Sequence, residues 1–252
     1  MVYTSLTEAP RNLKEGIDWL IALKGTSKFN MQVLGHAIYN FLVDKPVGTL
    51  LIPSLENVKR LSKEFLEQNE LKDLPYVEDL LSKFQKSMHI KSSGAATPSG
   101  LAPKSDYENI VQAKGIKPEE IAKNVGTVVD ACEKFLDDIK NPYLYKSSYS
   151  PEATWDASCA KNPETCAVIL VGIAPMLYVG LHSLSDANSP ALLGRRLPNS
   201  RNRLGVLLTA AGYKRPHCRA GMKVSDVREA LQSVSSKMLV TLYDLAGFWA
   251  FY

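Results

Sequence analysis

Cysteine is scarce in this chain, with four residues in 252. That number is too small for the disulfide framework of a small secreted domain, in which cross-links take the place of a hydrophobic core. The N-terminal sequence MVYTSLTEAPRNLKEG lacks the basic start and apolar stretch of a signal peptide. There is also no Asn-X-Ser/Thr acceptor for glycosylation. The sequence as written therefore does not support conventional secretion.

Complete catalytic signatures are absent as well. The chain contains no His-Glu-x-x-His, Gly-x-Ser-x-Gly or Gly-x-Gly-x-x-Gly motif. The spacing of Gly94 and Gly100 is not followed by the Gly-Lys-Ser/Thr of a phosphate-binding loop. We therefore expect a protein that is not an enzyme and that takes no cofactor, no metal and no small-molecule substrate.

Acidic residues are missing from residues 187–225, although the whole chain carries 26 of them. The basic residues of this stretch form what we call the basic patch: Arg195, Arg196, Arg201, Arg203, Lys214, Arg215, Arg219 and Lys223. Such a patch is suited to an anionic surface such as acidic lipid or nucleic acid. The alternative is a solvated face, or a loop neutralised by acidic residues elsewhere in the fold.

Apolar residues recur with helical spacing along most of the chain, and few segments alternate with the period of a strand. The pattern predicts an all-α protein, an irregular multi-helix bundle of about eight to nine helices with little or no sheet. We expect a single helical domain over residues 1–252. An alternative division has N-terminal helices at 1–91, a flexible Ser/Gly/Pro-rich linker at 92–105 and a C-terminal helical core at 106–252.

Local signals predict individual helix ends. Gly25 is expected to end a first helix, with Trp19 at the edge of its apolar stripe. Ser54 is expected to cap a third helix, and the capping-box pattern Ser105–Glu108 to open a short one. Ser225 is expected to cap a single last helix with Val227, Leu231, Val234, Met238, Leu242 and Leu245 in register.

The longest uncharged run is Thr165–Ser185, with 21 residues free of Asp, Glu, Lys and Arg. Its length is enough to span a bilayer. Pro175, Gly172, Gly180 and His182 interrupt its hydrophobicity, however, so the run favours a buried core helix over a membrane span.

The four cysteines allow several arrangements. Cys159 and Cys166 flank Lys161-Asn162-Pro163, a turn sequence that can bring two Cα atoms within disulfide range. Cys132 and Cys218 would then form a second pair. The alternatives are reduced cysteines, a zinc site that adds His217 to three cysteines, or a nucleophilic Cys166 at a helix N-terminus.

Several segments resemble the start of the variant erythrocyte surface antigen-like proteins of Babesia parasites. They are Ser5–Trp19, Cys132–Ile139, Ala153–Cys159, Cys166–Leu181 and Leu242–Tyr252. Together they reach across nearly the whole chain. The resemblance supports the Cys159–Cys166 disulfide, and it implies the N-terminal part of a larger protein that is exported without an ordinary signal peptide.

That resemblance implies a role in host-cell adhesion and immune evasion at the infected erythrocyte. The implied partners are a host-cell surface receptor or a sister antigen subunit, and the implied location is the erythrocyte surface or the exterior. Membrane anchoring is expected only through a segment absent from this chain. The alternative hypothesis is a cytoplasmic helical scaffold that binds anionic lipid or nucleic acid through the basic patch.

Overall fold

A computed structural model describes residues 2–85, 106–187 and 203–252, without 215 and 220. These residues form helices and no strand, which confirms the all-α prediction. Two isolated bridges pair Tyr3 with Tyr149 and Lys140 with Cys218. The predicted linker at 92–105 lies outside the described residues.

The described part of the chain holds nine helices of seven or more residues. They are α1 (Leu13–Lys24), α2 (Lys28–Leu42), α3 (Pro53–Leu66), α4 (Pro75–Gln85), α6 (Pro118–Ile139), α8 (Pro163–Asp186), α10 (Arg203–Ala210), α11 (Val224–Ala230) and α12 (Ser236–Leu245). Shorter helical turns are α5 (Ile110–Ala113), α7 (Trp155–Ser158), α13 (Phe248–Phe251) and the 3-10 turn η2 (Leu231–Ser233).

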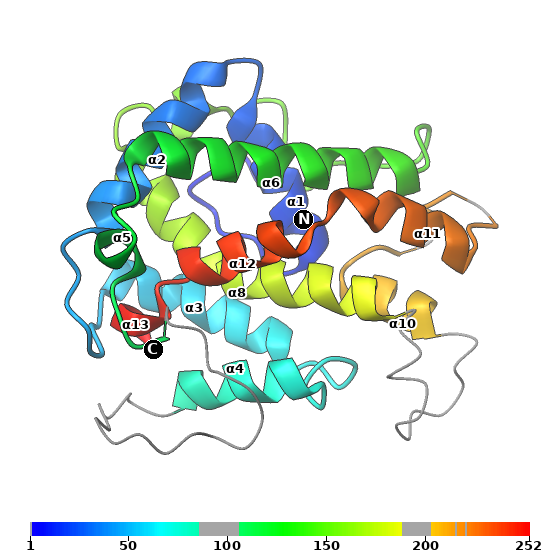
Figure 1. Cartoon of the computed structure of the whole chain (residues 1–252). Coiled ribbons are helices and arrows are strands. Elements are labelled where there is room, and N and C mark those ends of the chain that lie inside the picture. Colours follow the sequence, from blue (N-terminus) through cyan, green and yellow to red (C-terminus); the bar gives the residue numbers. More distant parts are fainter. Residues whose placement is uncertain (1, 86–105, 188–202, 215, 220) are drawn as a thin grey trace.

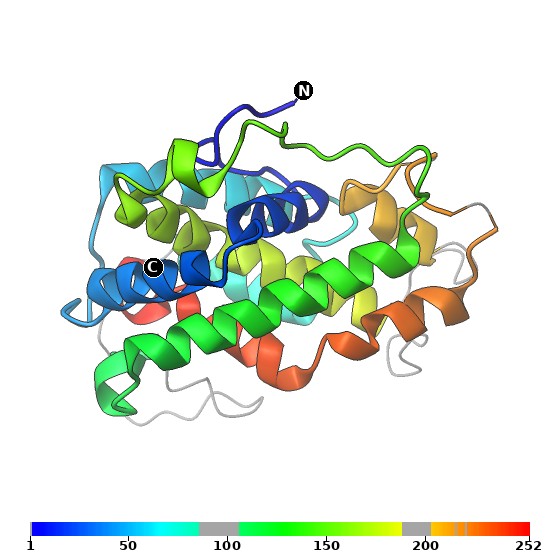
Figure 2. The same cartoon turned by 90° about the horizontal axis from the view of Figure 1, so that it is seen from above.

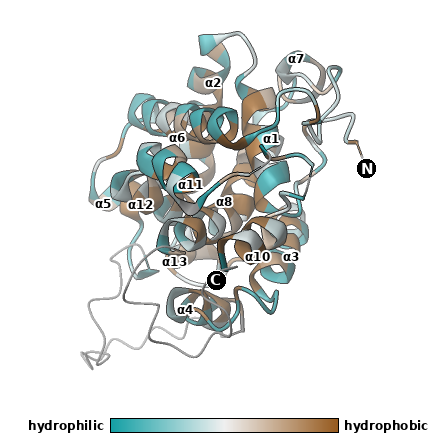
Figure 3. Cartoon of the chain, turned by 90° about the vertical axis from the view of Figure 1, so that its right-hand side faces the viewer, coloured by the Kyte–Doolittle hydropathy of each residue, from teal (hydrophilic) through white to brown (hydrophobic). Residues whose placement is uncertain are grey.

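Helix α8 is the centre of the bundle. It packs against α1, α2, α3, α4, α10 and α12, and Figure 3 shows its apolar ribbon surrounded by the other helices. α8 is long and apolar enough to cross a membrane, but 89% of its most apolar window is buried inside the fold. The uncharged run therefore forms a core helix, because its apolar surface is covered on all sides by protein.

The other helices are arranged around α8 in layers. In Figure 1, α6 lies above α8, and α3 and α4 lie below it. α2 packs against both α6 and α8, while α3 packs mainly against α8. Helices that precede residues 86–105 and helices that follow them thus contribute to the same hydrophobic core.

Two glycines permit the closest helix contacts. A Cβ atom on Gly35 of α2 would lie 2.6 Å from the backbone nitrogen of Ala122 in α6. A Cβ atom on Gly172 of α8 would lie 2.6 Å from the side chain of Val58 in α3. At this second crossing Ser62 donates a hydrogen bond to the Gly172 carbonyl, at 2.5 Å. The absence of a side chain is therefore what brings each pair of helices together.

The aromatic end of the chain is buried. The Phe251 ring stacks on Phe41 of α2, with ring centroids 5.4 Å apart. Lys59 of α3 donates to the Phe251 carbonyl, and its ammonium lies 4.5 Å from the centroid of the Tyr252 ring. Lys59 is itself 7% exposed. Its buried charge is compensated by Glu56 one turn earlier, at 2.8 Å, together with the Phe251 carbonyl and the Tyr252 ring.

Several predicted helix starts were wrong. α3 begins at Pro53, whose missing N–H suits the first helical position, so Ser54 is not a cap. The short helix α5 is capped by Asn109 and not by the Ser105–Glu108 pattern. The Asn109 amide also donates to three carbonyls at the end of α2, and this tertiary contact outweighs the local capping signal.

The single last helix and the position of Trp19 also need correction. The predicted helix is interrupted after η2. The Ser235 hydroxyl caps α12 by accepting a hydrogen bond from the backbone N–H of Met238, at 3.2 Å. Trp19 is fully buried, and its indole N–H donates a hydrogen bond to the Leu6 carbonyl at 2.8 Å. The N-terminal segment covers the side of α1 that the stripe alone placed at the edge.

Candidate functional site

The most extensive buried polar group of the described residues links α1 to the loop after α6, and we call it the Lys14–Asp18 clasp. Lys14 and Asp18 are one helical turn apart, with 2.8 Å between Nζ and Oδ2, and their side chains are 7% and 2% exposed. The Lys14 ammonium also donates to the Lys146 carbonyl at 3.0 Å and to Ser148 Oγ at 2.9 Å. Asp18 accepts from the Tyr145 hydroxyl and from the Ser148 backbone N–H, the latter at 2.8 Å.

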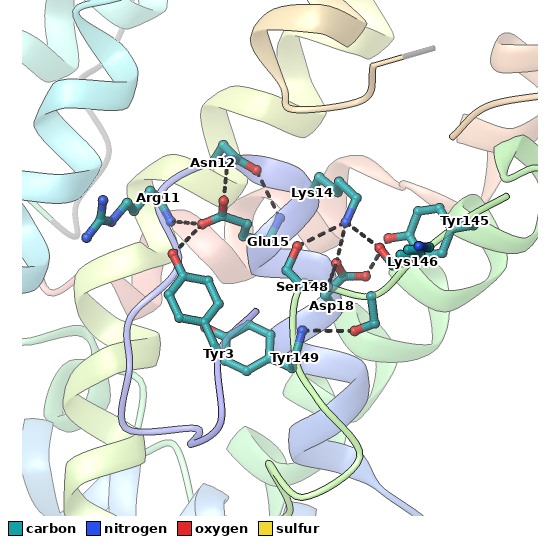
Figure 4. A network of polar contacts seen from close by, with 11 residues as sticks. Tyr3, Arg11, Asn12, Lys14, Glu15, Asp18, Tyr145, Lys146, Ser148 and Tyr149 are labelled. Atoms are coloured by element: carbon teal, nitrogen blue, oxygen red, sulfur yellow. Dashed lines mark hydrogen bonds and ion pairs between the residues drawn. The ribbon is translucent and has the colours of Figure 1, made fainter. Parts of the chain in front are cut away.

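The clasp continues along the N-terminal segment (Figure 4). Tyr3 donates to Glu15 Oε2 at 2.8 Å, and its ring stacks on Tyr149 with centroids 4.8 Å apart. Glu15 also accepts from the Arg11 backbone N–H and the Asn12 amide, both at 2.9 Å. α1 therefore carries two carboxylates, one of which fastens the segment before it and the other a loop more than a hundred residues later.

The electrostatics of the clasp favour a structural role. Burial, together with the nearby Asp18 carboxylate, raises the pKa of Tyr145 far above its usual range. Burial and the hydrogen bond to Glu15 likewise raise the pKa of Tyr3. Both phenols thus stay neutral donors at physiological pH, and each acceptor on α1 is engaged by groups of the chain itself. The arrangement holds a loop in place and presents no free acid or base.

Two of the four cysteines lie at disulfide distance. Cys159 and Cys166 are paired, with 5.9 Å between their Cα atoms, and both are fully buried. The pair joins α7 to the first turn of α8. The turn 160–165 lies between the two cysteines. Residues of this turn and of α2 line a surface groove of about 400 Å³. The groove is lined by Val33, His36, Ala37, Asn40, Phe41, Lys45, Asn162, Pro163 and Glu164.

The second predicted pair is not formed. Cys132 and Cys218 are both free. The backbone of Cys218 forms an isolated antiparallel β-bridge with Lys140. Lys140 follows Cys132 by eight residues, which corresponds to about 12 Å along a helix axis. Disulfides require Cα atoms within about 7 Å, so this pairing was wrong. The zinc hypothesis loses Cys159 and Cys166 as ligands, because their sulfurs are joined to each other.

The basic patch is only partly described. Arg195, Arg196, Arg201 and Arg215 lie outside the described residues. Arg203 begins α10, and Lys214, Arg219 and Lys223 are exposed. Arg219 caps α6, because its guanidinium donates to the carbonyl of Asp137 at 2.8 Å and to that of Lys140 at 3.3 Å. One member of the patch thus has a structural role.

The clasp could not be predicted from the sequence. The only local signal was a Lys and an Asp four residues apart on one helix, a spacing typical of exposed ion pairs. Their burial depends on Tyr145 and Ser148, far along the chain.

Comparisons of this chain with protein-family models, curated proteins and solved structures found no match.

Proposed function

We propose that this chain is a non-enzymatic helical domain of an exported parasite antigen, of the variant erythrocyte surface antigen-like kind that its sequence resembles. The observation that carries the proposal is the buried Cys159–Cys166 pair. Disulfides persist in oxidising compartments and are rare in reducing cytosol. A cross-linked helical domain outside the parasite plasma membrane is consistent with both the resemblance and this pair.

The distribution of contacts supports a display role. Buried groups such as the Lys14–Asp18 clasp and Lys59 are engaged by partners within the chain. A core fixed in this way tolerates changes on exposed loops with little loss of stability. In the proposed role, those loops present the surface that meets a host-cell receptor or a sister antigen subunit.

The test combines location with cysteine mapping on protein from infected erythrocytes. We expect the chain to lie outside the parasite. Trypsin added to intact infected cells should cleave it, or it should be recovered from their culture fluid. Peptide mapping without reductant should recover Cys159 linked to Cys166. Protein found only inside the parasite plasma membrane, with four free thiols, would overturn the proposal.

The alternative function is a cytoplasmic scaffold that binds nucleic acid or anionic lipid through the basic patch. The exposed ammonium groups of Lys214 and Lys223 favour it. Replacing Arg195, Arg196, Arg201 and Arg203 by glutamine should then abolish a steeply salt-dependent binding. Binding that salt does not affect, or that survives these replacements, would eliminate this function.

A further inference from the structure

The loop that the Lys14–Asp18 clasp holds ends in an exposed tip. Asn141 accepts hydrogen bonds at its carbonyl from the backbone of Leu144 at 3.2 Å and of Tyr145 at 2.8 Å. Its side-chain oxygen accepts from the Tyr143 backbone N–H at 3.1 Å. The resulting turn is tight, and it projects two apolar side chains: Tyr143 is 93% exposed and Leu144 is 47% exposed.

The tip is fastened on both sides. Before it, the Asn141 backbone N–H donates to the His217 carbonyl at 2.8 Å. After it, the Tyr145 hydroxyl donates to buried Asp18, and the Lys146 carbonyl accepts from Lys14. The exposed side chains are therefore held by a rigid base, so that binding through them loses little backbone entropy.

Basic groups lie beside these apolar side chains. Lys146 directly follows the turn, with its carbonyl held by Lys14 and its side chain exposed. Lys214 is brought alongside because the His217 N–H donates to the Lys214 carbonyl at 2.8 Å and the His217 ring lies 6.2 Å from that of Tyr145. Figures 1 and 2 show the loop after α6 and the segment before α11 at the same end of the molecule.

Lysines outnumber carboxylates among the charged groups that act on His217. The pKa of His217 is lowered by burial and then by Lys14, Lys146 and Lys214, against which only Asp18 acts. Asp18 is buried and already paired with Lys14. Asp137, at the end of α6, is paired with Lys140. The ammonium groups of Lys146 and Lys214 have no ion pair among the described residues.

We propose that Tyr143, Leu144, Lys146 and Lys214, named here the Tyr143 tip, form a docking site for the surface of an anionic lipid bilayer. Tyrosine and leucine enter the interface between head groups and acyl chains, and flanking lysines attract anionic head groups. The exposed aliphatic side chain of Leu144 beside Tyr143 favours lipid over nucleic acid, because bases stack on aromatic rings and make no comparable use of an aliphatic side chain. The site is independent of the proposed function. It shares only one residue, Lys214, with the basic patch.

The test is co-sedimentation of the purified full chain with phosphatidylcholine vesicles, with and without phosphatidylserine. We expect binding only to the anionic vesicles, weakened by added salt. Each lysine near an anionic surface strengthens binding about fivefold. The Lys146→Gln/Lys214→Gln variant should therefore bind roughly thirtyfold more weakly. The control Lys123→Gln/Lys237→Gln removes two exposed lysines elsewhere and should lose far less.

Insertion is read separately from charge. Tyr143→Trp places an exposed indole at the tip, and brominated phosphatidylserine vesicles should quench its fluorescence but not that of the buried tryptophans. Tyr143→Ser/Leu144→Ser should reduce vesicle binding, whereas Tyr107→Ser, at another exposed tyrosine that is 65% exposed, should not. Unchanged binding by the tip variants, with native circular dichroism and Tm, would overturn the proposal. The proposal would also be overturned if the chain bound single-stranded RNA and did not bind the vesicles.

Discussion

Gly35 of α2 lies against Ala122 of α6 so closely that a methyl group on residue 35 would overlap the Ala122 backbone. The contact is between backbones and has no flexible side chain that could move aside. The α2–α6 crossing therefore depends on one missing Cβ atom.

Replacing Gly35 by alanine should lower the free energy of unfolding by about 1–3 kcal/mol, the usual cost of overpacking. The matched control is Gly126→Ala in α6, where no atom lies within 4 Å of the new methyl group. That change should raise stability by about 0.5–1 kcal/mol through helix propensity. Urea unfolding measures the change in the free energy of unfolding for both variants. Equal changes for Gly35→Ala and Gly126→Ala would contradict the close contact at the α2–α6 crossing.

Breaking the clasp should be costly. Lys14→Met leaves the Asp18 carboxylate buried without its cation, and we expect a loss of about 3–5 kcal/mol. Adding Asp18→Leu removes the orphaned charge, so the double variant should lose less than the sum of the two single changes. The exposed pair Lys63–Glu67, 3.7 Å apart, should show changes of less than about 1 kcal/mol in the same cycle.

The Cys159–Cys166 pair closes a short loop. In the chain-entropy model a loop of this size contributes about 2–3 kcal/mol. Cys159→Ala/Cys166→Ala should therefore lower Tm, and reductant should lower the Tm of the natural chain in the same way. Reductant should leave the double variant unchanged, and any further shift there would show that another cross-link exists.

The two free thiols should differ in reactivity. Burial raises the pKa of Cys132 to about 12, so hardly any thiolate is present near neutral pH. Cys218 is half-buried, and its pKa is also raised. We expect iodoacetamide to modify Cys218 slowly and Cys132 only after unfolding, as followed by peptide mass spectrometry. Rapid modification of Cys132 in the folded chain would contradict the packing of α6.

His182 should contribute to a fall of stability in mild acid. Burial lowers the pKa of this histidine, and the nearby Asp186 only partly opposes the shift. The unfolded chain then binds a proton more readily than the folded one, so stability is fully present above the unfolded pKa of about 6.5 and decreases below it. His182→Gln should flatten the dependence of Tm on pH between about 7 and 5, while His36→Gln, at an exposed histidine, should not.

Helix content could be predicted because apolar spacing reports directly on which face is buried. The break before α12 could not, since Val227, Leu231, Val234 and Met238 remain in register across it. The serines at 233, 235 and 236 were the available signal, because serine favours a cap over a helix interior.

The polar interior was harder to predict than the helices. Lys14 and Asp18 look like a surface pair until Tyr145 and Ser148 cover them. Asp106 behaves similarly: its pattern suggested a capping box, yet it is 1% exposed and bound to Lys83 and Tyr243. In each case the deciding partner lies on another element, and periodicity carries no information about it.

The central place of α8 also sets when the core around α3 can form during synthesis. α3 ends at Leu66, and the helix that it mainly covers begins only at Pro163. Ribosomes add about 5–20 residues per second, so the intervening residues take roughly 5–20 s. During that interval the face of the nascent α3 that α8 covers stays exposed, although α1 and α2 already gain α6 as a partner. Chaperones that cover this apolar face during translation should therefore raise the yield of this protein.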